Sequence, residues 1–261
     1  MGLFGFGKKK NVAQKKDIDD ADFLLTKDTS FDVKESYNEL RTNVMFSLAG
    51  EGCKKISFTS SVASEGKSTT CFNLAITFAE LDSKVLVIDC DLRKPKLNKF
   101  VKLKETEGLS NYLIGKAKLD KIVHNSGREN LDVLLAGNVP PNPSELLSSP
   151  KMQEMVDELS KKYDYIFFDA PPITVVTDAA IISSLIDGFV VVVRHQIADK
   201  TLVKLALSKL DFVNAKIIGL VLNDVHSEKN KYGYYKYGYY RRGYYKYGYY
   251  RRSYYNQEEA K

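Results

Sequence analysis

Cysteine is scarce in this sequence, and long apolar runs are absent from it. The three cysteines, Cys53, Cys71 and Cys90, lie in or beside apolar stretches and form no C-x-x-C pair. This spacing excludes a disulfide framework and a thiolate metal cluster, and it indicates reduced core residues of a cytosolic protein. The apolar run at 189–193 is far shorter than the roughly 20 residues that a membrane span requires. Because no signal peptide precedes it either, we expect a soluble protein.

A net positive charge is missing from most of the chain, although the net charge of the whole chain is +6. Residues 1–16 carry five lysines and no acid, and residues 228–261 carry nine basic and three acidic residues. The region between these ends is therefore net acidic. We expect an anionic partner at the ends rather than on the domain. The apolar residues Leu3, Phe4 and Phe6 precede a lysine cluster, which could contact an anionic membrane weakly or form a solvated terminus.

A phosphate-binding loop is indicated at residues 59–69, T-S-S-V-A-S-E-G-K-S-T. A strand-like run at 55–59 precedes it and a small-residue-rich helical stretch follows it, which is the context of a P-loop. Backbone N–H groups and the positive end of the helix dipole would bind phosphate, Lys67 would reach the β- and γ-phosphates, and Ser68 could ligate Mg²⁺. The pattern departs from G-x-x-x-x-G-K-[ST] only at Ser61, which replaces the first glycine. We therefore predict a nucleotide site.

Two further strands of the expected sheet end in carboxylates. Residues 84–89, K-V-L-V-I-D, are followed by Cys90 and Asp91, so two acids face the crevice at the carboxyl end of a parallel strand. Residues 165–169, Y-I-F-F-D, are a buried strand ending in Asp169, the Walker B pattern that orients Mg²⁺ or its water. A single aspartate at a strand end is often a helix cap. With a P-loop upstream, the metal role is favoured.

Alternating strands and helices predict an α/β fold with a mostly parallel central sheet and helices on both faces. The length suits one large domain with tails. We assign residues 1–30 to a flexible basic segment, 31–227 to the domain and 228–261 to a tail. The expected helices are 35–48, 108–115, 151–162, 173–185 and 199–211, and the expected strands are 55–59, 84–89, 131–136, 165–169, 188–194 and 216–223.

The tail is a tyrosine cluster. Its unit Y-Y-K-Y-G-Y-Y-R-R-G recurs with a ten-residue period, and the tail holds 13 of the 17 tyrosines. It has no aliphatic side chains from which to build a core, so we expect it to be disordered. Aromatic residues interleaved with arginine could also stack on nucleic-acid bases. The tyrosines are Tyr232, Tyr234, Tyr235, Tyr237, Tyr239, Tyr240, Tyr244, Tyr245, Tyr247, Tyr249, Tyr250, Tyr254 and Tyr255.

Taken together, these features resemble the bacterial tyrosine kinase (BY-kinase) family of capsule and exopolysaccharide loci, of the CpsD/CapB kind. The most specific motifs are S-E-G-K-S-T, V-L-V-I-D-C-D-L-R-K-P, G-N-V-P-P-N-P-S-E-L-L and Y-D-Y-I-F-F-D-A-P-P. The resemblance extends from Glu35 nearly to the end of the chain. It implies a P-loop NTPase fold with ParA/MinD-like relatives.

The resemblance also implies an activity, a protein-tyrosine autokinase that uses ATP and Mg²⁺ and phosphorylates the tail tyrosines in trans. It implies control of polysaccharide synthesis and export. It implies two protein partners: a membrane-embedded activator of the chain-length-regulator type, which recruits the protein to the inner membrane face, and an opposing tyrosine phosphatase. It further implies a homo-oligomeric ring and no nucleic-acid partner. The implied catalytic residues are Lys67, Asp89 and Asp91, the metal residues Ser68, Asp89 and Asp169, and the ATP contacts Ser64, Glu65, Gly66, Lys67, Ser68, Thr69 and Asn223.

The chain departs from the family's motifs at one point, and it differs from the nearest alternative class at another. The family's oligomerisation helix carries E-x-x-R-x-x-R, and here Glu35 and Arg41 are present while Asn38 replaces the first arginine, which suggests a weakened or rearranged ring. ParA/MinD-type ATPases carry an early lysine in K-G-G-x-G-K, which this loop lacks. A regulatory ATPase of that type, or a nucleic-acid-binding ATPase that uses the tail, remains the alternative reading. Asn223, expected near the adenine, could equally be an ordinary turn residue.

Overall fold

The computed structural model describes residues 20–48, 50–101, 103 and 107–225. The basic ends of the chain and all of the tail tyrosines lie outside these residues. The chain divides into one compact unit, Met1–Asn223, and a second, Asp224–Lys261. The first unit contains the sheet and every predicted site residue apart from the tyrosines. No helix in the described part is long and apolar enough to cross a bilayer.

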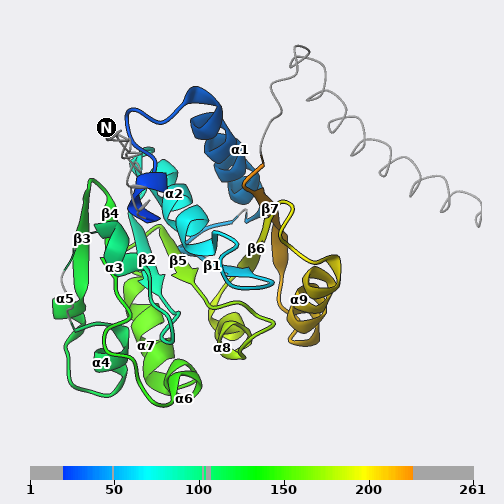
Figure 1. Cartoon of the computed structure of the whole chain (residues 1–261). Coiled ribbons are helices and arrows are strands. Elements are labelled where there is room, and N and C mark those ends of the chain that lie inside the picture. The colour runs from blue at the N-terminus through cyan, green and yellow to red at the C-terminus, as the bar shows by residue number, and fades with distance from the viewer. Residues whose placement is uncertain (1–19, 49, 102, 104–106, 226–261) are drawn as a thin grey trace, which may run out of the picture. The chain divides into compact units, whose positions relative to one another are not determined.

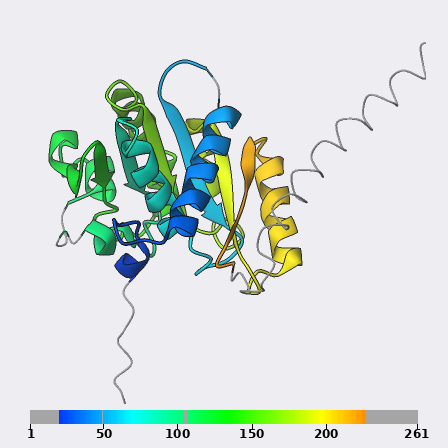
Figure 2. The ribbon, with the colours of Figure 1, turned by 90° about the horizontal axis from the view of Figure 1, so that it is seen from above.

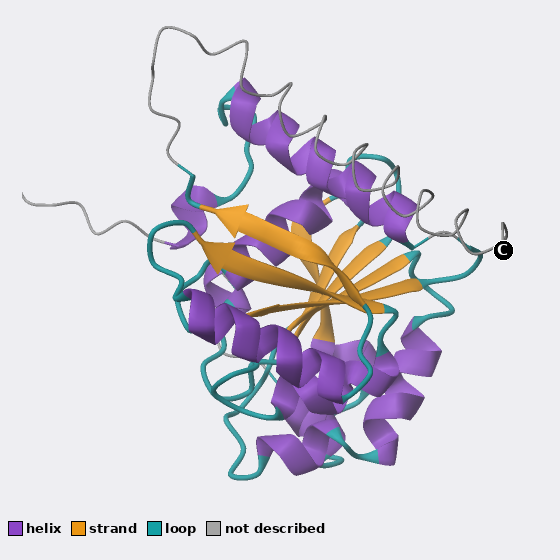
Figure 3. Cartoon of the chain, turned by 90° about the vertical axis from the view of Figure 1, so that its right-hand side faces the viewer, coloured by secondary structure: helices purple, strands orange, loops and turns teal. Residues whose placement is uncertain are grey.

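A seven-stranded sheet forms the centre of the first unit (Figures 1 and 3). The strand order is β3-β4-β2-β5-β1-β6-β7, and only the β3–β4 pair is antiparallel. This arrangement confirms the α/β class and the mostly parallel sheet. The strands are β1 (Lys54–Ser60), β2 (Val85–Asp89), β3 (Val123–Arg128), β4 (Leu131–Leu134), β5 (Tyr165–Asp169), β6 (Gly188–Arg194) and β7 (Ile217–Asn223).

Helices cover both faces of this sheet, as Figure 2 shows from above. The first face packs on a hydrophobic cluster with α1 (Phe31–Ser47), α2 (Lys67–Ala79) and α3 (Leu97–Val101). The second face packs on a larger cluster with the remaining helices. These are α4 (Leu109–Leu113), α5 (Leu119–Ile122), α6 (Pro143–Leu147), α7 (Pro150–Leu159), α8 (Asp178–Ile181) and α9 (Lys200–Phe212), together with the 3-10 turn η2 (Ile182–Leu185); a further 3-10 turn, η1 (Asp20–Phe23), precedes α1.

The sequence of β6 explains why both faces are buried. Val190 and Val192 belong to the first cluster, whereas Phe189 and Val191 belong to the second. Successive side chains of a strand point to opposite faces, so a strand covered on both sides needs an unbroken apolar run. The run G-F-V-V-V-V-R meets this need, and its final arginine marks the edge of the core.

Two expectations about the elements are wrong, and one strand was not expected. Helix α1 begins at Phe31, four residues earlier than expected. The expected helix at 173–185 forms only from Asp178, because the backbone N–H of Ile173 donates to the carbonyl of Ser60 and ties this stretch to β1. The antiparallel strand β3 was not predicted, because V-H-N-S-G-R is polar and carries a bulge in its pairing with β4.

Residues 20–25 pack on the domain, contrary to the flexibility expected for this part of the segment 1–30; residues 1–19 lie outside the described part. Leu24 and Leu25 are buried in the first hydrophobic cluster. Asn73, a buried residue of α2, accepts from the N–H of Leu25 at 2.8 Å and donates to the carbonyl of Phe23 at 3.0 Å. The same amide donates to the hydroxyl of Tyr37 at 3.1 Å. One side chain therefore joins the segment at 20–25 and α1 to the helix that follows the phosphate-binding loop.

Replacing this asparagine should loosen the N-terminal segment. We expect Asn73→Ala to lower the free energy of unfolding by about 2–4 kcal/mol, because the buried N–H of Leu25 and the part-buried carbonyl of Phe23 lose their partner. Urea denaturation measures this change, and hydrogen exchange should become faster at residues 20–25. The matched control is Asn43→Ala on the exposed side of α1, which should change stability by less than about 0.5 kcal/mol. Equal effects of the two substitutions would contradict the assignment.

Candidate nucleotide-binding site

The topology brings the predicted acids to one place. Strands β2, β5 and β1 are neighbours, and their parallel register pairs Asp89 with Asp169 and Asp169 with Phe58. All three strands therefore end at the same edge of the sheet. The loop that follows β1 starts there, and α2 begins at Lys67. This is the crevice in which open α/β sheets bind their ligands.

The loop adopts a backbone conformation that favours small residues. Gly66 has a φ of 88°, and Ser64 has a φ of 66°, both in the left-handed region. A Cβ atom on Gly66 would lie 2.0 Å from the amide nitrogen of Asn223, so a side chain at this position would have to displace that amide and adopt a strained φ. That amide donates instead to the carbonyl of Glu65 at 3.0 Å. The structure thus places Asn223 against the loop that precedes α2.

Lys67 is the centre of the charge cluster. Its Nζ lies 3.1 Å from Asp169 Oδ1 and 3.2 Å from Asp91 Oδ2, and it donates to the hydroxyl of Ser68 at 3.4 Å. Burial by itself would lower the pKa of Lys67, but the charges of Asp169, Asp91 and Asp89 outweigh burial and raise it. The ammonium is therefore permanently charged, and it is held at the point where α2 begins.

The two aspartates after β2 have different surroundings. Both oxygens of Asp89 accept backbone hydrogen bonds, Oδ1 from Asp91 at 3.2 Å and Oδ2 from Lys96 and Leu97 at 3.1 Å each. Asp89 is fully buried, and burial followed by the charge of Asp169 raises its pKa. Asp91 accepts one backbone bond, from Lys94 at 3.0 Å, and turns its other oxygen to Lys67. Asp89 shapes the loop, and Asp91 faces the lysine.

Asp169 has the chemistry of a cation ligand. It is fully buried, and its Oδ2 accepts no hydrogen bond from any residue that the structure describes. Burial raises the pKa of Asp169, and the positive charge of Lys67 opposes this shift. Among the described residues, no group of three His, Cys, Asp or Glu side chains could hold a metal. Mg²⁺ usually takes one or two carboxylates together with phosphate oxygens and water, so an unpartnered carboxylate oxygen beside Ser68 fits this ion.

A second ion pair lies beside the site and was not predicted. The guanidinium of Arg93 binds both oxygens of Asp178, with Nε at 2.8 Å and Nη2 at 3.1 Å, and Nη2 also donates to the hydroxyl of Ser144 at 3.0 Å. That hydroxyl donates to Asp178 at 2.6 Å. The network ties the segment after β2 to α6 and α8. No local pattern could have identified it, because Arg93 and Asp178 lie 85 residues apart.

Most of the predicted site residues lie together. The loop residues, Lys67, Ser68, the three aspartates and Asn223 all lie at the carboxyl edge of the sheet, and Thr69 is partly buried in the first turn of α2. Glu35 and Arg41 lie on α1, away from this edge. The predicted acceptor tyrosines lie outside the described residues.

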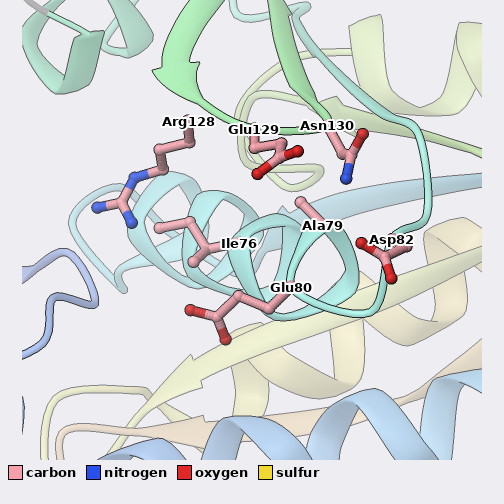
Figure 4. Close-up of a pocket in the computed structure, with 7 residues that line it drawn as sticks. All are labelled: Ile76, Ala79, Glu80, Asp82, Arg128, Glu129 and Asn130. Carbon is pink, nitrogen blue, oxygen red and sulfur yellow. The ribbon is translucent and has the colours of Figure 1, made fainter.

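A separate cavity of about 200 Å³ contains none of these residues. It lies between the C-terminal part of α2 and the turn from β3 to β4, where acidic side chains outnumber one arginine (Figure 4). It therefore offers no phosphate-binding surface comparable to the loop. Its lining residues are Ile76, Ala79, Glu80, Asp82, Arg128, Glu129 and Asn130.

The fold and the site define a P-loop ATPase-type domain, and comparison with known proteins gives the same class. Residues 53–217 match the family described as AAA domain. The solved septum site-determining protein MinD complexed with Mg-ADP from Pyrococcus horikoshii is similar at 26% identity and a TM-score of 0.56, covering 65% of this chain and 70% of that one. The class therefore includes nucleotide-binding relatives.

Within this class, the chain belongs to the family of bacterial tyrosine-protein kinases. It is 40% identical over 202 residues to the tyrosine-protein kinase YwqD of Bacillus subtilis, covering 77% of this chain and 85% of the relative. It is 38% identical to the putative tyrosine-protein kinase CapB of Staphylococcus aureus, covering 78% and 89%. The solved kinase domain of the Escherichia coli tyrosine kinase ETK has a TM-score of 0.71 and 32% identity, covering 77% and 80%. The resemblance inferred from the motifs is confirmed.

The Arg93–Asp178 pair should contribute measurably to stability. We expect Arg93→Ala to lower the free energy of unfolding by about 1–3 kcal/mol, since buried Asp178 then loses its charged partner; the exposure of Arg93 moderates the loss. The loss of stability in Arg93→Lys should lie between zero and the loss in Arg93→Ala, because a lysine ammonium cannot bind both oxygens of Asp178 as the planar guanidinium does. Urea denaturation measures these changes. Lys94→Ala is the control, since its side chain is exposed. Similar losses at both positions would show that the ion pair contributes nothing specific.

Proposed function

We propose that this chain is an ATP-dependent protein-tyrosine autokinase that phosphorylates its own C-terminal tyrosines in trans. The observation that carries the proposal is the position of Lys67 between Asp91 and Asp169, at the start of the helix that follows the phosphate-binding loop. Family membership supports the same reaction, because the relatives are named tyrosine-protein kinases. The tail supplies acceptor hydroxyls in large number, and 13 tyrosines are more than structure or base stacking would require.

The residues suggest a division of labour in phosphoryl transfer. Lys67 exchanges its carboxylate partners for phosphate oxygens when ATP binds, and it neutralises charge as the bond to the leaving ADP breaks. The tyrosine oxygen forms the new bond to phosphorus, and the carboxylate of Asp91 accepts the phenol proton. Asp91 is suited to this task because only one of its oxygens is used by the backbone.

We also propose where Mg²⁺ binds. Ser68 and Asp169 would hold it, and Asp89 would support the neighbouring loop while keeping lone pairs free for the ion or its water. When bound, Mg²⁺ supplies positive charge that neutralises the phosphates. The unpartnered Oδ2 of Asp169 is the observation that favours this arrangement.

Removing the lysine tests the donor site. We expect Lys67→Met to abolish tail phosphorylation, because the phosphates lose their main side-chain cation. The measurement is intact-mass analysis after incubation with MgATP, in parallel with an anti-phosphotyrosine blot. Circular dichroism checks that the variant is folded, and a chain with all 13 tail tyrosines changed to Phe shows the background.

Phosphotyrosine retained in the purified Lys67→Met variant would place the donor site elsewhere. A wild-type chain that hydrolyses ATP but acquires no phosphate would instead favour a regulatory ATPase of the ParA/MinD type. A salt-dependent filter-binding assay with single-stranded RNA distinguishes the third reading, that of a nucleic-acid-binding tail.

Separate variants distinguish the two aspartates after β2. We expect Asp91→Asn to lower turnover by about 10²–10⁴-fold, the usual contribution of a proton acceptor, with little change in MgADP affinity. Asp89→Asn should weaken MgADP binding and lower stability. Both oxygens of Asp89 accept backbone N–H groups, so the donor nitrogen of an asparagine would have to face one of these N–H groups. Calorimetric titration and single-turnover rates measure these effects. Equal losses of nucleotide affinity in both variants would refute the division.

The proposal extends to partners and assembly. A membrane-embedded activator of the chain-length-regulator type would recruit the kinase to the inner membrane face, a tyrosine phosphatase would reverse the modification, and the cycle would control capsular or exopolysaccharide synthesis. A homo-oligomeric ring would allow reaction in trans. In the single chain, Arg41 donates to the carbonyl of Thr77 at 2.6 Å and Asn38 donates to Glu35 at 2.9 Å. If Glu35 and Arg41 also contact a neighbouring subunit in a ring, they must either keep these contacts within their own chain or exchange them for contacts with the neighbour.

A further inference from the structure

The phosphate-binding loop contains a buried carboxylate. Glu65 stands directly before Gly66 and is fully buried, although it carries the same sign of charge as the phosphates that the loop would bind. A buried carboxylate costs free energy unless donors surround it. Its position therefore needs a physical reason.

The carboxylate of Glu65 closes the loop on itself. Its Oε2 accepts from the hydroxyl of Ser61 at 2.8 Å and from the backbone N–H of Val62 at 2.9 Å. These two residues begin the loop, and Glu65 lies near its end. The side chain thus joins the two ends of the turn, and it does so through Ser61, the residue that replaces the first glycine of the P-loop pattern.

The same residue joins the loop to the edge of the sheet. Glu65 Oε1 accepts from the backbone N–H of Arg194 at 3.4 Å, and its carbonyl accepts from the amide of Asn223 at 3.0 Å. Arg194 and Asn223 end β6 and β7 and are register partners. The guanidinium of Arg194 also donates to the carbonyl of Ser64 at 3.3 Å. Five donors from three segments therefore fix residues 64–65.

We propose that Glu65 is a positioning residue that holds the loop in its phosphate-binding shape before the nucleotide arrives, with Ser61 as its partner. The inference rests on the proposed nucleotide-binding function. The carboxylate faces Ser61, Val62 and Arg194, so it opposes no phosphate directly. Fixing the loop in advance removes the cost of ordering it on binding, and the gain appears as nucleotide affinity.

The test is calorimetric titration of the full chain with MgADP, together with kcat and KM for ATP. We expect Glu65→Ala to weaken MgADP binding about tenfold or more and to raise KM while kcat at saturating ATP is kept. Glu65→Gln should lose less, because its amide oxygen can still accept from Ser61 and Val62. Ser61→Ala should lose a few-fold in affinity. The double variant Ser61→Ala with Glu65→Ala should bind no more weakly than Glu65→Ala alone, as for two partners in one contact.

Glu80→Ala is the matched control, an exposed glutamate at the end of α2. Urea denaturation of each nucleotide-free variant shows whether the affinity change exceeds any loss of stability. Wild-type affinity in Glu65→Ala, or equal losses in the Gln and Ala variants, would overturn the inference while leaving the proposed function intact. A wild-type chain that binds no MgADP would overturn both.

Discussion

The attraction between one lysine and the carboxylates around it is the interaction on which the site depends. Lys67 lies within 3.2 Å of both Asp91 and Asp169, inside a crevice where burial raises the cost of an unpaired charge. Each acid reaches this place from a different strand, and the lysine comes from a helix. The position of the ammonium therefore requires the three strands β1, β2 and β5 to be in register, and it requires α2 to begin at the edge where they end.

The two hydrophobic layers provide that register. The central strands are covered on both sides, and β2 and β5 each carry an apolar run that ends in an aspartate. The acids of the candidate site thus lie at one edge of the sheet. The outer strands β6 and β7 add no acid, but their last residues contact the phosphate-binding loop. They contact the loop with hydrogen-bond donors, the N–H and guanidinium of Arg194 and the amide of Asn223.

The sequence predicted the central strands and the residues that end them, because both follow from local patterns: an apolar run, then an acid or a loop of small residues. It did not predict β3, whose polar residues hide its pairing, or the late start of α8, which depends on a hydrogen bond from Ile173 to β1. Contacts between distant segments were also missed. The Arg93–Asp178 pair and the side-chain bond from Ser61 to Glu65 depend on geometry that no spacing rule encodes.

The unequal numbers of charges at the site have a consequence for its supply of ligand. Two carboxylates, Asp91 and Asp169, contact the single ammonium of Lys67, and a third, Asp89, also helps to raise its pKa, so acids outnumber the lysine at the resting site even though the whole chain is basic. A nucleotide that arrives alone brings further negative charge beside these acids, whereas its complex with a divalent ion brings compensating positive charge. We expect occupancy in a cell to follow the concentration of the metal complex rather than that of total nucleotide, so that magnesium availability becomes an input to the kinase.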